Sequence, residues 1–321
     1  MFYRLIKSYA RLAIKLYCKK IVVNKPELLS GKGPVLFAAN HPNSFLDGII
    51  LTTLLDAPLY SLARGDAFKN KVLAPILRKL LLLPVYRTSE GVENLGSNYV
   101  TFKACQEAFK AKSCVLIFSE ARCVNEWQLR PLRKGTARLA FSSWQEGIPL
   151  KVIPLAFNYD RFTFFGKTVH LNFGDAIPPL ITGEGNPTGK QLKEFNDQLY
   201  KTLDPLVYKA ANPLEIKNYF PKIKSGFKSL ICFLPGLVGW LVHAPLFFIC
   251  KFYTDLKFKK SDHYDSVLTS LLLITYPVYL LFFVVLMFQI IRGFSLLGLF
   301  VLPITAWCWL QINHLFIRNS S

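Results

Sequence analysis

Acidic residues are scarce in this sequence. Its 321 residues include 20 Asp and Glu against 39 Lys and Arg, which gives a formal net charge of +19, and yet 52% of the residues are hydrophobic. This combination is typical of a protein that sits on and in a membrane, with Lys and Arg facing anionic headgroups or anionic substrates. A strongly positive charge could also bind nucleic acid. No zinc pattern or RNA-binding signature accompanies the charge, so we predict no nucleic-acid partner.

The sequence also lacks the cysteine and histidine patterns of disulfide and metal proteins. Its seven cysteines are odd in number and form no Cys-x-x-Cys pair. Such scattering is typical of reduced, buried cysteines, and it predicts a soluble part that faces a cytoplasm. The five histidines include no pair at helical metal-ligand spacing, so we predict no metal site. A Gly-x-Ser-x-Gly elbow is missing too, which disfavours a serine hydrolase.

Residues 1–21 predict a basic amphipathic helix, because apolar residues recur at helical spacing with Lys and Arg between them. The segment lacks the uninterrupted apolar core of a signal peptide or a membrane span. We therefore expect the helix to lie in the membrane interface. Packing of the helix on its own domain is the alternative, and the two are compatible at different ends of the helix.

Residues 22–228 alternate short apolar runs with helical patterns, and this length suits a single domain. The expected strands are 35–39, 59–63, 81–86, 114–118, 151–157 and a hairpin-like pair around 166–167 that reaches residue 173. The expected helices are 44–55, 68–80, 92–111, 136–145 and 189–208. This alternation predicts an α/β fold with a helix-flanked mixed, largely parallel sheet. Reactive turns then gather at the edge where the strands end.

One polar stretch, residues 40–48, stands between an expected buried strand and an expected helix. Asn43 or Ser44 is expected to cap that helix, whose N-terminal N–H groups favour negative charge. His41 and Asp47 can meet across the turn. Asp47 would then fix the imidazole tautomer while the other ring nitrogen acts as a general base. A surface or capping pair is the alternative for a lone His near an Asp.

The stretch His41-Pro42-Asn43-Ser44-Phe45-Leu46-Asp47 resembles the His-x-x-x-x-Asp signature of the glycerolipid (PlsC-like) acyltransferases, especially the branch of bacterial and yeast-type glycerol-3-phosphate acyltransferases. The apolar run 83–86, which ends in Arg87, resembles a second family block, and residues 152–156 resemble the family's Val-x-Pro strand. The resemblance implies that Arg87 holds the acceptor phosphate, for which a guanidinium fork is suited. Arg64 is expected as a second phosphate ligand.

Residues 117–123 resemble the family's Phe-Pro-Glu-Gly-x-Arg-Ser turn, with departures. Glu120 is retained and is expected to accept a hydrogen bond from a glycerol hydroxyl or to orient a basic neighbour. Ala121 stands in place of Gly, so the turn either avoids a positive φ there or accepts strain. Cys123 replaces the usual Arg. The cation that completes the phosphate site is therefore open among Arg122, Arg130, Arg133 and Lys134.

These blocks together imply a membrane-bound acyltransferase of phospholipid biosynthesis. His41 is the expected general base and Asp47 its partner; Asn43 and Ser44 are expected near the substrate, with helix-start or turn N–H groups on the oxyanion. The donor is acyl-CoA or acyl carrier protein, used as a co-substrate and not as a cofactor. The acceptor is glycerol-3-phosphate or 1-acyl-glycerol-3-phosphate. A different lysophospholipid or aminolipid acceptor is one alternative, and a non-catalytic membrane scaffold is another.

Residues 229–317 form the expected membrane region. The stretch 230–250 has no charged residue but contains prolines and glycines, which suits a re-entrant or interfacial pair of half-helices. Residues 267–291 and 294–317 are each long enough to span about 30 Å of hydrocarbon, and we expect them to form a transmembrane hairpin. Basic flanks place the catalytic domain in the cytoplasm. Three full crossings are the alternative topology. The compact length favours the inner membrane of a bacterium.

Overall fold

The computed structural model describes residues 1–86, 96–163, 165–180, 187–220, 226–291, 296–313 and 316. Seven strands form one sheet in the order β1-β7-β6-β2-β5-β3-β4. The strands are β1 (Cys18–Val23), β2 (Val35–Ala39), β3 (Leu59–Arg64), β4 (Leu82–Val85), β5 (Cys114–Phe118), β6 (Lys151–Tyr159) and β7 (Lys167–Phe173). Neighbouring strands are parallel except β6 and β7, which form an antiparallel pair. The predicted mixed, largely parallel sheet is confirmed.

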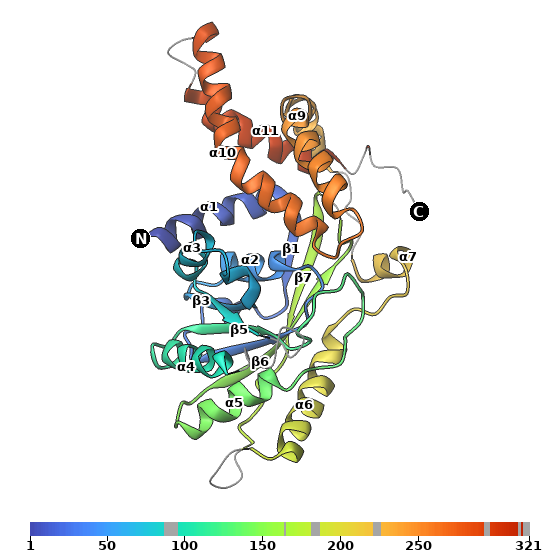
Figure 1. Ribbon diagram of the computed structural model, residues 1–321. Coiled ribbons are helices and arrows are strands. Elements are labelled where there is room, and N and C mark those ends of the chain that lie inside the picture. Colours follow the sequence, from blue (N-terminus) through green and yellow to red (C-terminus); the bar gives the residue numbers. More distant parts are fainter. Residues whose placement is uncertain are drawn as a thin grey trace.

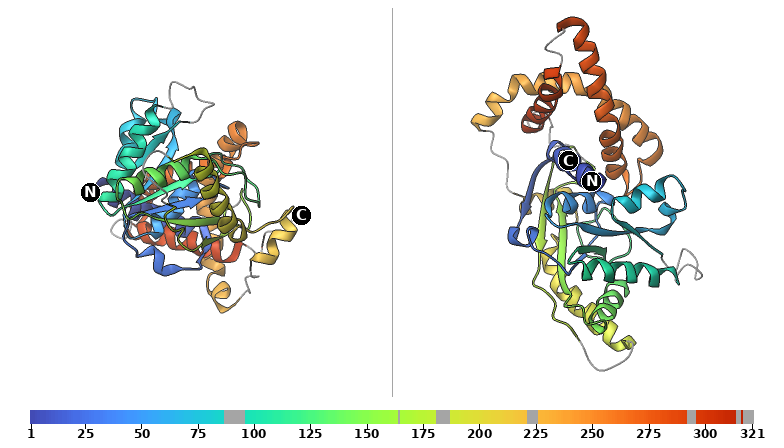
Figure 2. Two further views of the ribbon diagram at one scale, coloured as in Figure 1. Left: turned by 90° about the horizontal axis from the view of Figure 1, so that it is seen from below. Right: turned by 90° about the vertical axis from the view of Figure 1, so that its left-hand side faces the viewer.

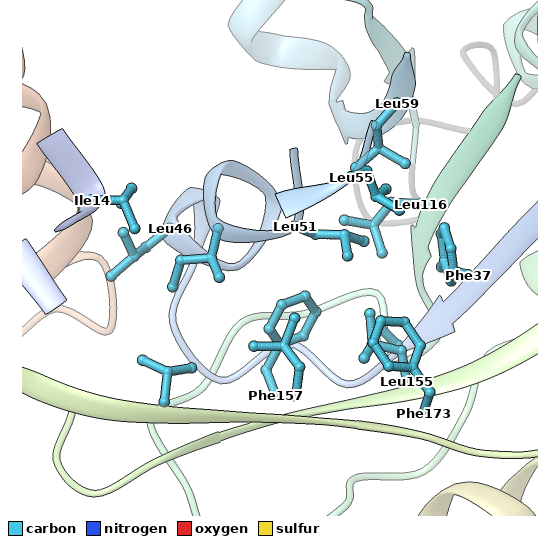
Figure 3. Packing of buried hydrophobic residues seen from close by; sticks show 14 of the residues in the cluster. Ile14, Phe37, Leu46, Leu51, Leu55, Leu59, Leu116, Leu155, Phe157 and Phe173 are labelled. Atoms are coloured by element: carbon cyan, nitrogen blue, oxygen red, sulfur yellow. The ribbon is translucent and has the colours of Figure 1, made fainter. Parts of the chain in front are cut away.

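Helices cover both faces of the sheet, as Figure 1 shows. One face carries α1 (Phe2–Tyr17) and α2 (Phe45–Leu54), and the other carries α4 (Ser97–Lys110), α5 (Gly135–Gln145) and α6 (Gly189–Leu203). Side chains alternate along β2 between the two hydrophobic cores. Phe37 packs in the core under α1 and α2 with Leu46, Leu155 and Phe173 (Figure 3), whereas Leu36 packs in the opposite core. This period of two explains why β2 reads as a continuous apolar run.

Several predicted boundaries need correction. Residues 18–23 form the edge strand β1, so the first helix ends at Tyr17 and not at residue 21. A 3-10 turn over Gly65–Phe68 precedes α3 (Leu73–Lys79), which begins later than the predicted residue 68. The predicted start of the 92–111 helix lies outside the described residues. Finally, α6 ends at Leu203 and is followed by a 3-10 turn over Asp204–Leu206, because proline in this turn removes a helical N–H donor.

Helix α1 packs on the catalytic domain at its C-terminal end. Ile14 and Tyr17 are buried in the core under α2, and Arg11 Nε donates to the Thr53 carbonyl oxygen at 2.7 Å. Toward the N-terminus, Phe2 and Leu5 are exposed. One end of the helix is thus a packed element, and the other presents apolar side chains between basic ones.

The C-terminal region contains α8 (Phe227–Ile231), α9 (Phe233–Phe258), α10 (Tyr264–Ile291) and α11 (Gly298–Ile312). Two of them are long and apolar enough to cross a membrane: α9, and α10 over Tyr264–Gln289. They form an antiparallel hairpin, in which His243 Nε2 lies 3.1 Å from the Tyr276 hydroxyl and the Tyr264 hydroxyl donates to Asp255 Oδ1 at 2.6 Å. Figure 2 shows α10 projecting away from the catalytic domain.

The predicted C-terminal hairpin of two long apolar helices is confirmed, but its arms are α9 and α10 and not residues 267–291 and 294–317. Residues 230–250 do not form a pair of half-helices, because α9 continues through Pro245 to Phe258. Nor does the last apolar stretch form the second arm of the hairpin. Its helix α11 has 15 residues, about 22 Å at 1.5 Å per residue, and it packs mainly against α9. The expected tight connection at residues 292–293 lies outside the described residues.

Candidate active site

His41 and Asp47 meet beyond the end of β2. The His41 Nδ1 atom lies 3.0 Å from Asp47 Oδ2, and the Asp47 side chain is fully buried while the imidazole is 14% exposed. The imidazole stacks on the Phe118 ring with 3.6 Å between the ring centroids. One imidazole nitrogen is therefore held by a carboxylate, and this arrangement leaves Nε2 for a substrate proton.

Both oxygens of the Asp47 carboxylate are occupied. Oδ2 also accepts the Asn43 N–H at 2.9 Å, and Oδ1 accepts the Tyr159 hydroxyl at 2.6 Å. These three donors fix the carboxylate in place. Burial and the neighbouring Asp47 charge raise the pKa of Tyr159, so that this hydroxyl keeps its proton and remains a donor.

The loop between His41 and Asp47 is longer than the family signature suggests. Five residues, 42–46, separate the two side chains, whereas the signature His-x-x-x-x-Asp contains four. The additional length goes with an unusual backbone: Ser44 has φ 51° and ψ −141°. A non-glycine residue at positive φ persists only where neighbouring groups hold it. The literal signature is thus not met, yet the imidazole and carboxylate still meet.

The expected capping of α2 is wrong, because neither Asn43 nor Ser44 caps the helix with its side chain. The Asn43 amide instead donates from Nδ2 to Asp265 Oδ2 at 3.0 Å, and the Ser44 Oγ lies 2.8 Å from His263 Nδ1. In this structure both side chains bond to the segment that begins α10. Their predicted part in substrate binding remains a prediction.

Three N–H groups at the start of α2 already have acceptors within the protein. Asn43 N–H donates to Asp47, Ser44 N–H to Cys123 Sγ at 3.0 Å, and Leu46 N–H to Ser266 Oγ at 3.3 Å. These three donors are used within the protein. The part of helix-start or turn N–H groups as oxyanion donors stays a prediction.

Glu120 supports the dyad from the turn after β5. Its Oε2 accepts the His41 N–H at 2.9 Å and its Oε1 accepts the Arg130 N–H at 2.9 Å. The side chain is buried, and burial raises its pKa from 4.5 to about 7 against these two hydrogen bonds. Glu120 therefore orients the backbone of the candidate base. The next residue, Ala121, has φ 56°. Of the two possibilities for an Ala in place of Gly, the turn therefore has the strained one, with a positive φ.

The predicted cations have different surroundings. Arg64 ends β3 at the same sheet edge, where its guanidinium pairs with Asp66. Arg122 follows the Glu120 turn and is exposed. Arg87 lies outside the described residues. Cys123, at the position of the family's Arg, is a buried thiol whose pKa is raised by burial. In the described chain, no three His, Cys, Asp or Glu side chains gather where they could hold a metal ion.

Sequence reasoning missed three residues of the site. Tyr159 and Phe118 are strand residues, and nothing in a strand pattern distinguishes a catalytic neighbour from a core residue. Asn40 was inside the polar stretch but had no assigned role. Its side chain pairs with the Phe157 backbone in both directions, with Nδ2 donating at 3.2 Å and Oδ1 accepting at 2.8 Å. This pairing ties the end of β2 to β6 and places His41 beyond it.

The fold brings a histidine and a carboxylate together at the end of a strand of a largely parallel sheet. The Acyltransferase family matches residues 20–158, which run from within β1 into β6 and include the dyad and Glu120. Residues 20–158 are therefore an acyltransferase domain, and the chain is an acyltransferase.

A solved structure is similar to this chain at low identity. It is that of the 1-acyl-sn-glycerophosphate (LPA) acyltransferase PlsC from Thermotoga maritima, with 14% identity and a TM-score of 0.44. The likeness covers 70% of this chain and 81% of that chain. Among curated proteins, none matches this sequence.

Proposed function

We propose that the protein transfers a fatty acyl group from an acyl thioester, acyl-CoA or acyl-ACP, to the hydroxyl of glycerol-3-phosphate or 1-acyl-glycerol-3-phosphate. The observation that carries this proposal is the His41–Asp47 pair, 3.0 Å apart and set on Phe118 and Tyr159 inside an acyltransferase domain. A thioester is an activated acyl donor, so a base that deprotonates the acceptor suffices and no acyl-enzyme is needed.

In the proposed reaction, His41 Nε2 removes the proton of the acceptor hydroxyl as its oxygen attacks the thioester carbonyl. The carbon–oxygen bond forms, the carbon–sulfur bond breaks, and the imidazolium returns its proton to the leaving thiolate. Asp47 stabilises the imidazolium through Nδ1. Arg122, Arg64 and Arg87 are the proposed cations for the acceptor phosphate, since the first two lie beside the Glu120 turn and at the end of β3.

A second acceptor class has one observation in its favour. The turn 119–123 departs from the family pattern, and its Cys123 side chain is a buried thiol that accepts the Ser44 N–H, at a place where the family carries a cation. The loss of this charge suits an acceptor without a phosphate monoester, such as a different lysophospholipid or an aminolipid. The two acceptor classes differ in charge and can be told apart by assay.

We also propose that the enzyme is an integral membrane protein with its catalytic domain in the cytoplasm, in a bacterial inner membrane. Support for the membrane comes from the apolar residues of α10 that are exposed on this long helix, among them Ile274, Val278 and Phe282. Helix α9 contacts the catalytic domain, since its Phe247 ring lies 5.9 Å from that of Phe165. This contact favours an interfacial orientation for α9.

The test is a transfer assay with the full chain in membranes. Labelled acyl-CoA and acyl-ACP are offered with glycerol-3-phosphate, lysophosphatidic acid and a panel of other lysolipids, using wild type and His41→Ala. We expect a product from a phosphate monoester acceptor that disappears in His41→Ala, while membrane association persists. Transfer only to other lysolipids would establish the second acceptor class, and turnover by His41→Ala would show that the proposed base is wrong.

A further inference from the structure

A buried ion pair joins the catalytic domain to the start of α10. Lys167 in β7 pairs through Nζ with Asp265 Oδ2, and their side chains are 0% and 1% exposed. Asp265 also accepts the Tyr17 hydroxyl of α1 and, at Oδ2, the Asn43 amide. One carboxylate of the membrane hairpin thus binds three donors from three parts of the catalytic domain.

Two residues, Asn43 and Tyr159, connect the ion pair to the dyad. Asn43, whose side chain donates to Asp265, gives its backbone N–H to Asp47 Oδ2. The Lys167 ammonium lies 5.7 Å from the centroid of the Tyr159 ring, and the Tyr159 hydroxyl donates to Asp47 Oδ1. Both oxygens of Asp47 are therefore held by residues that themselves contact the ion pair.

The rest of the same segment holds the loop between His41 and Asp47. Ser266 Oγ donates to the Asn43 carbonyl oxygen at 2.9 Å and accepts the Leu46 N–H, and His263 Nδ1 lies 2.8 Å from Ser44 Oγ. The loop contains Ser44 at positive φ. A backbone of this kind needs fixed partners, and most of those partners belong to the hairpin.

Stability alone is a poor explanation for this arrangement. Burying two charges costs desolvation energy that their attraction barely repays, and apolar residues of similar volume are often equally stable there. An ion pair does, however, impose one geometry on the groups around it. A positioning function accounts for a charged pair at this place better than packing does.

We propose that the Lys167–Asp265 ion pair is a positioning device, through which docking of the α9–α10 hairpin on the catalytic domain sets the geometry of the His41–Asp47 dyad. Lys167 and Asp265 touch no substrate; they act through Asn43 and Tyr159. The catalytic domain is competent only with the hairpin seated on it. This inference rests on the proposed role of His41 as the base.

The experiment compares three variants of the full chain in detergent micelles. The double variant Lys167→Met/Asp265→Leu removes both charges together, so that neither is left buried and unpaired. Asn43→Ala breaks the link to the dyad but keeps the ion pair, and it serves if the double variant does not fold. Tyr276→Phe is the matched control, because it removes a hairpin hydrogen bond, to His243, that lies away from the loop.

Two readouts separate positioning from general loss of structure. The first is steady-state transfer: we expect kcat to fall by about tenfold or more with KM within about a factor of two in the double variant and in Asn43→Ala, and no change in Tyr276→Phe. The second is the downfield proton resonance of His41 Nδ1–H bonded to Asp47, assigned by its loss in His41→Ala. We expect it to vanish in the first two variants and to persist in the control.

Wild-type kcat and an unchanged resonance in either folded variant would overturn the positioning proposal. A wild-type enzyme that transfers no acyl group, but whose His41 resonance is lost in the variants, would instead overturn the proposed function and leave the positioning role standing.

Discussion

The Tyr159 hydroxyl donates to Asp47 Oδ1 at 2.6 Å, from a strand 112 residues away in the sequence. It is one of three donors to a carboxylate that has no contact with solvent. A buried carboxylate that loses one donor is left with an unsatisfied oxygen, which is expensive in a low-dielectric interior. The orientation of His41 therefore depends on a tyrosine that never touches the imidazole.

Replacing Tyr159 with Phe tests this dependence. We expect the free energy of unfolding to fall by about 1–3 kcal/mol, the cost of an unsatisfied buried acceptor. We also expect kcat to fall by about tenfold, since a shift of 1.4 kcal/mol in the transition state suffices for that. The matched control is Tyr208→Phe, which removes a hydroxyl bonded to His170 Nδ1 at 2.9 Å, away from the dyad. Equal kcat values for the two variants would contradict the expectation.

The pKa of Glu120 predicts how stability depends on pH. Burial raises this pKa to about 7 in the folded protein from 4.5 in the unfolded chain. The folded state therefore binds a proton that the unfolded state has released. The resulting stabilisation is complete below pH 4.5, is lost as the pH rises through 7, and amounts to about 3 kcal/mol from the size of the shift.

Glu120→Gln isolates this contribution. The amide does not titrate, so we expect the wild-type protein to lose stability relative to the variant as the pH rises from 4.5 to 7. The measurement is the free energy of unfolding of both proteins in detergent across this range. A difference between them that stays constant with pH would show that Glu120 does not titrate there.

The positive φ of Ala121 predicts that glycine at this position stabilises the protein. Its φ of 56° lies in the left-handed region, which costs a residue with a Cβ about 1–2 kcal/mol and costs glycine nothing. Glycine loses part of this gain through its greater freedom in the unfolded chain. We expect Ala121→Gly to raise the free energy of unfolding by about 0.5–1 kcal/mol.

The reverse change at Gly147 is the control for Ala121. Gly147 has φ 74°, and a Cβ there would meet no atom within 4 Å, so only the backbone conformation is tested. We expect Gly147→Ala to lower the free energy of unfolding by about 1 kcal/mol. Denaturant unfolding measures both variants, and shifts of the same sign would refute the assignment of strain.

The packing of α11 against α9 depends on the absence of a side chain at Gly239. A Cβ at this position would lie 2.2 Å from the Thr305 carbonyl oxygen, a backbone atom that cannot move away alone. Small residues permit such close approach of membrane helices. We expect Gly239→Ala to separate α11 from α9 and to speed hydrogen exchange in Gly298–Ile312. Gly226→Ala is the control, because a Cβ there meets nothing within 4 Å, and fast exchange in both variants would exclude this explanation.

Much of the fold follows from local sequence pattern. The runs 35–39 and 114–118 gave strands with the predicted bounds, because strands buried on both faces read as continuous apolar segments. The edge strand β1 was missed, since its Lys19 and Lys20 continue the basic pattern of α1. Long-range pairing with β7 decides its structure, and no local pattern contains that information.

In the candidate site, too, some residues could be predicted from local sequence and others could not. His41, Asp47 and Glu120 occur in short polar stretches after strands, where sequence position alone suggests a reactive edge. Their partners come from distant segments: Tyr159 from β6 and Asp265 from α10. The expected caps Asn43 and Ser44 failed for this reason, because residues more than 200 positions away compete for their side chains.

The bond between Tyr17 and Asp265 spans 248 positions of the chain, and it sets an order of events during synthesis. Tyr17 leaves the ribosome among the first residues, whereas Asp265 emerges after the whole catalytic domain has been made. Lys167 is translated well before Asp265, its counter-ion. Burial of the Lys167 ammonium is unfavourable until Asp265 is present to pair with it. If the positioning proposal holds, the catalytic domain stays incomplete until the hairpin that follows it has been made, and acyl transfer starts after that step.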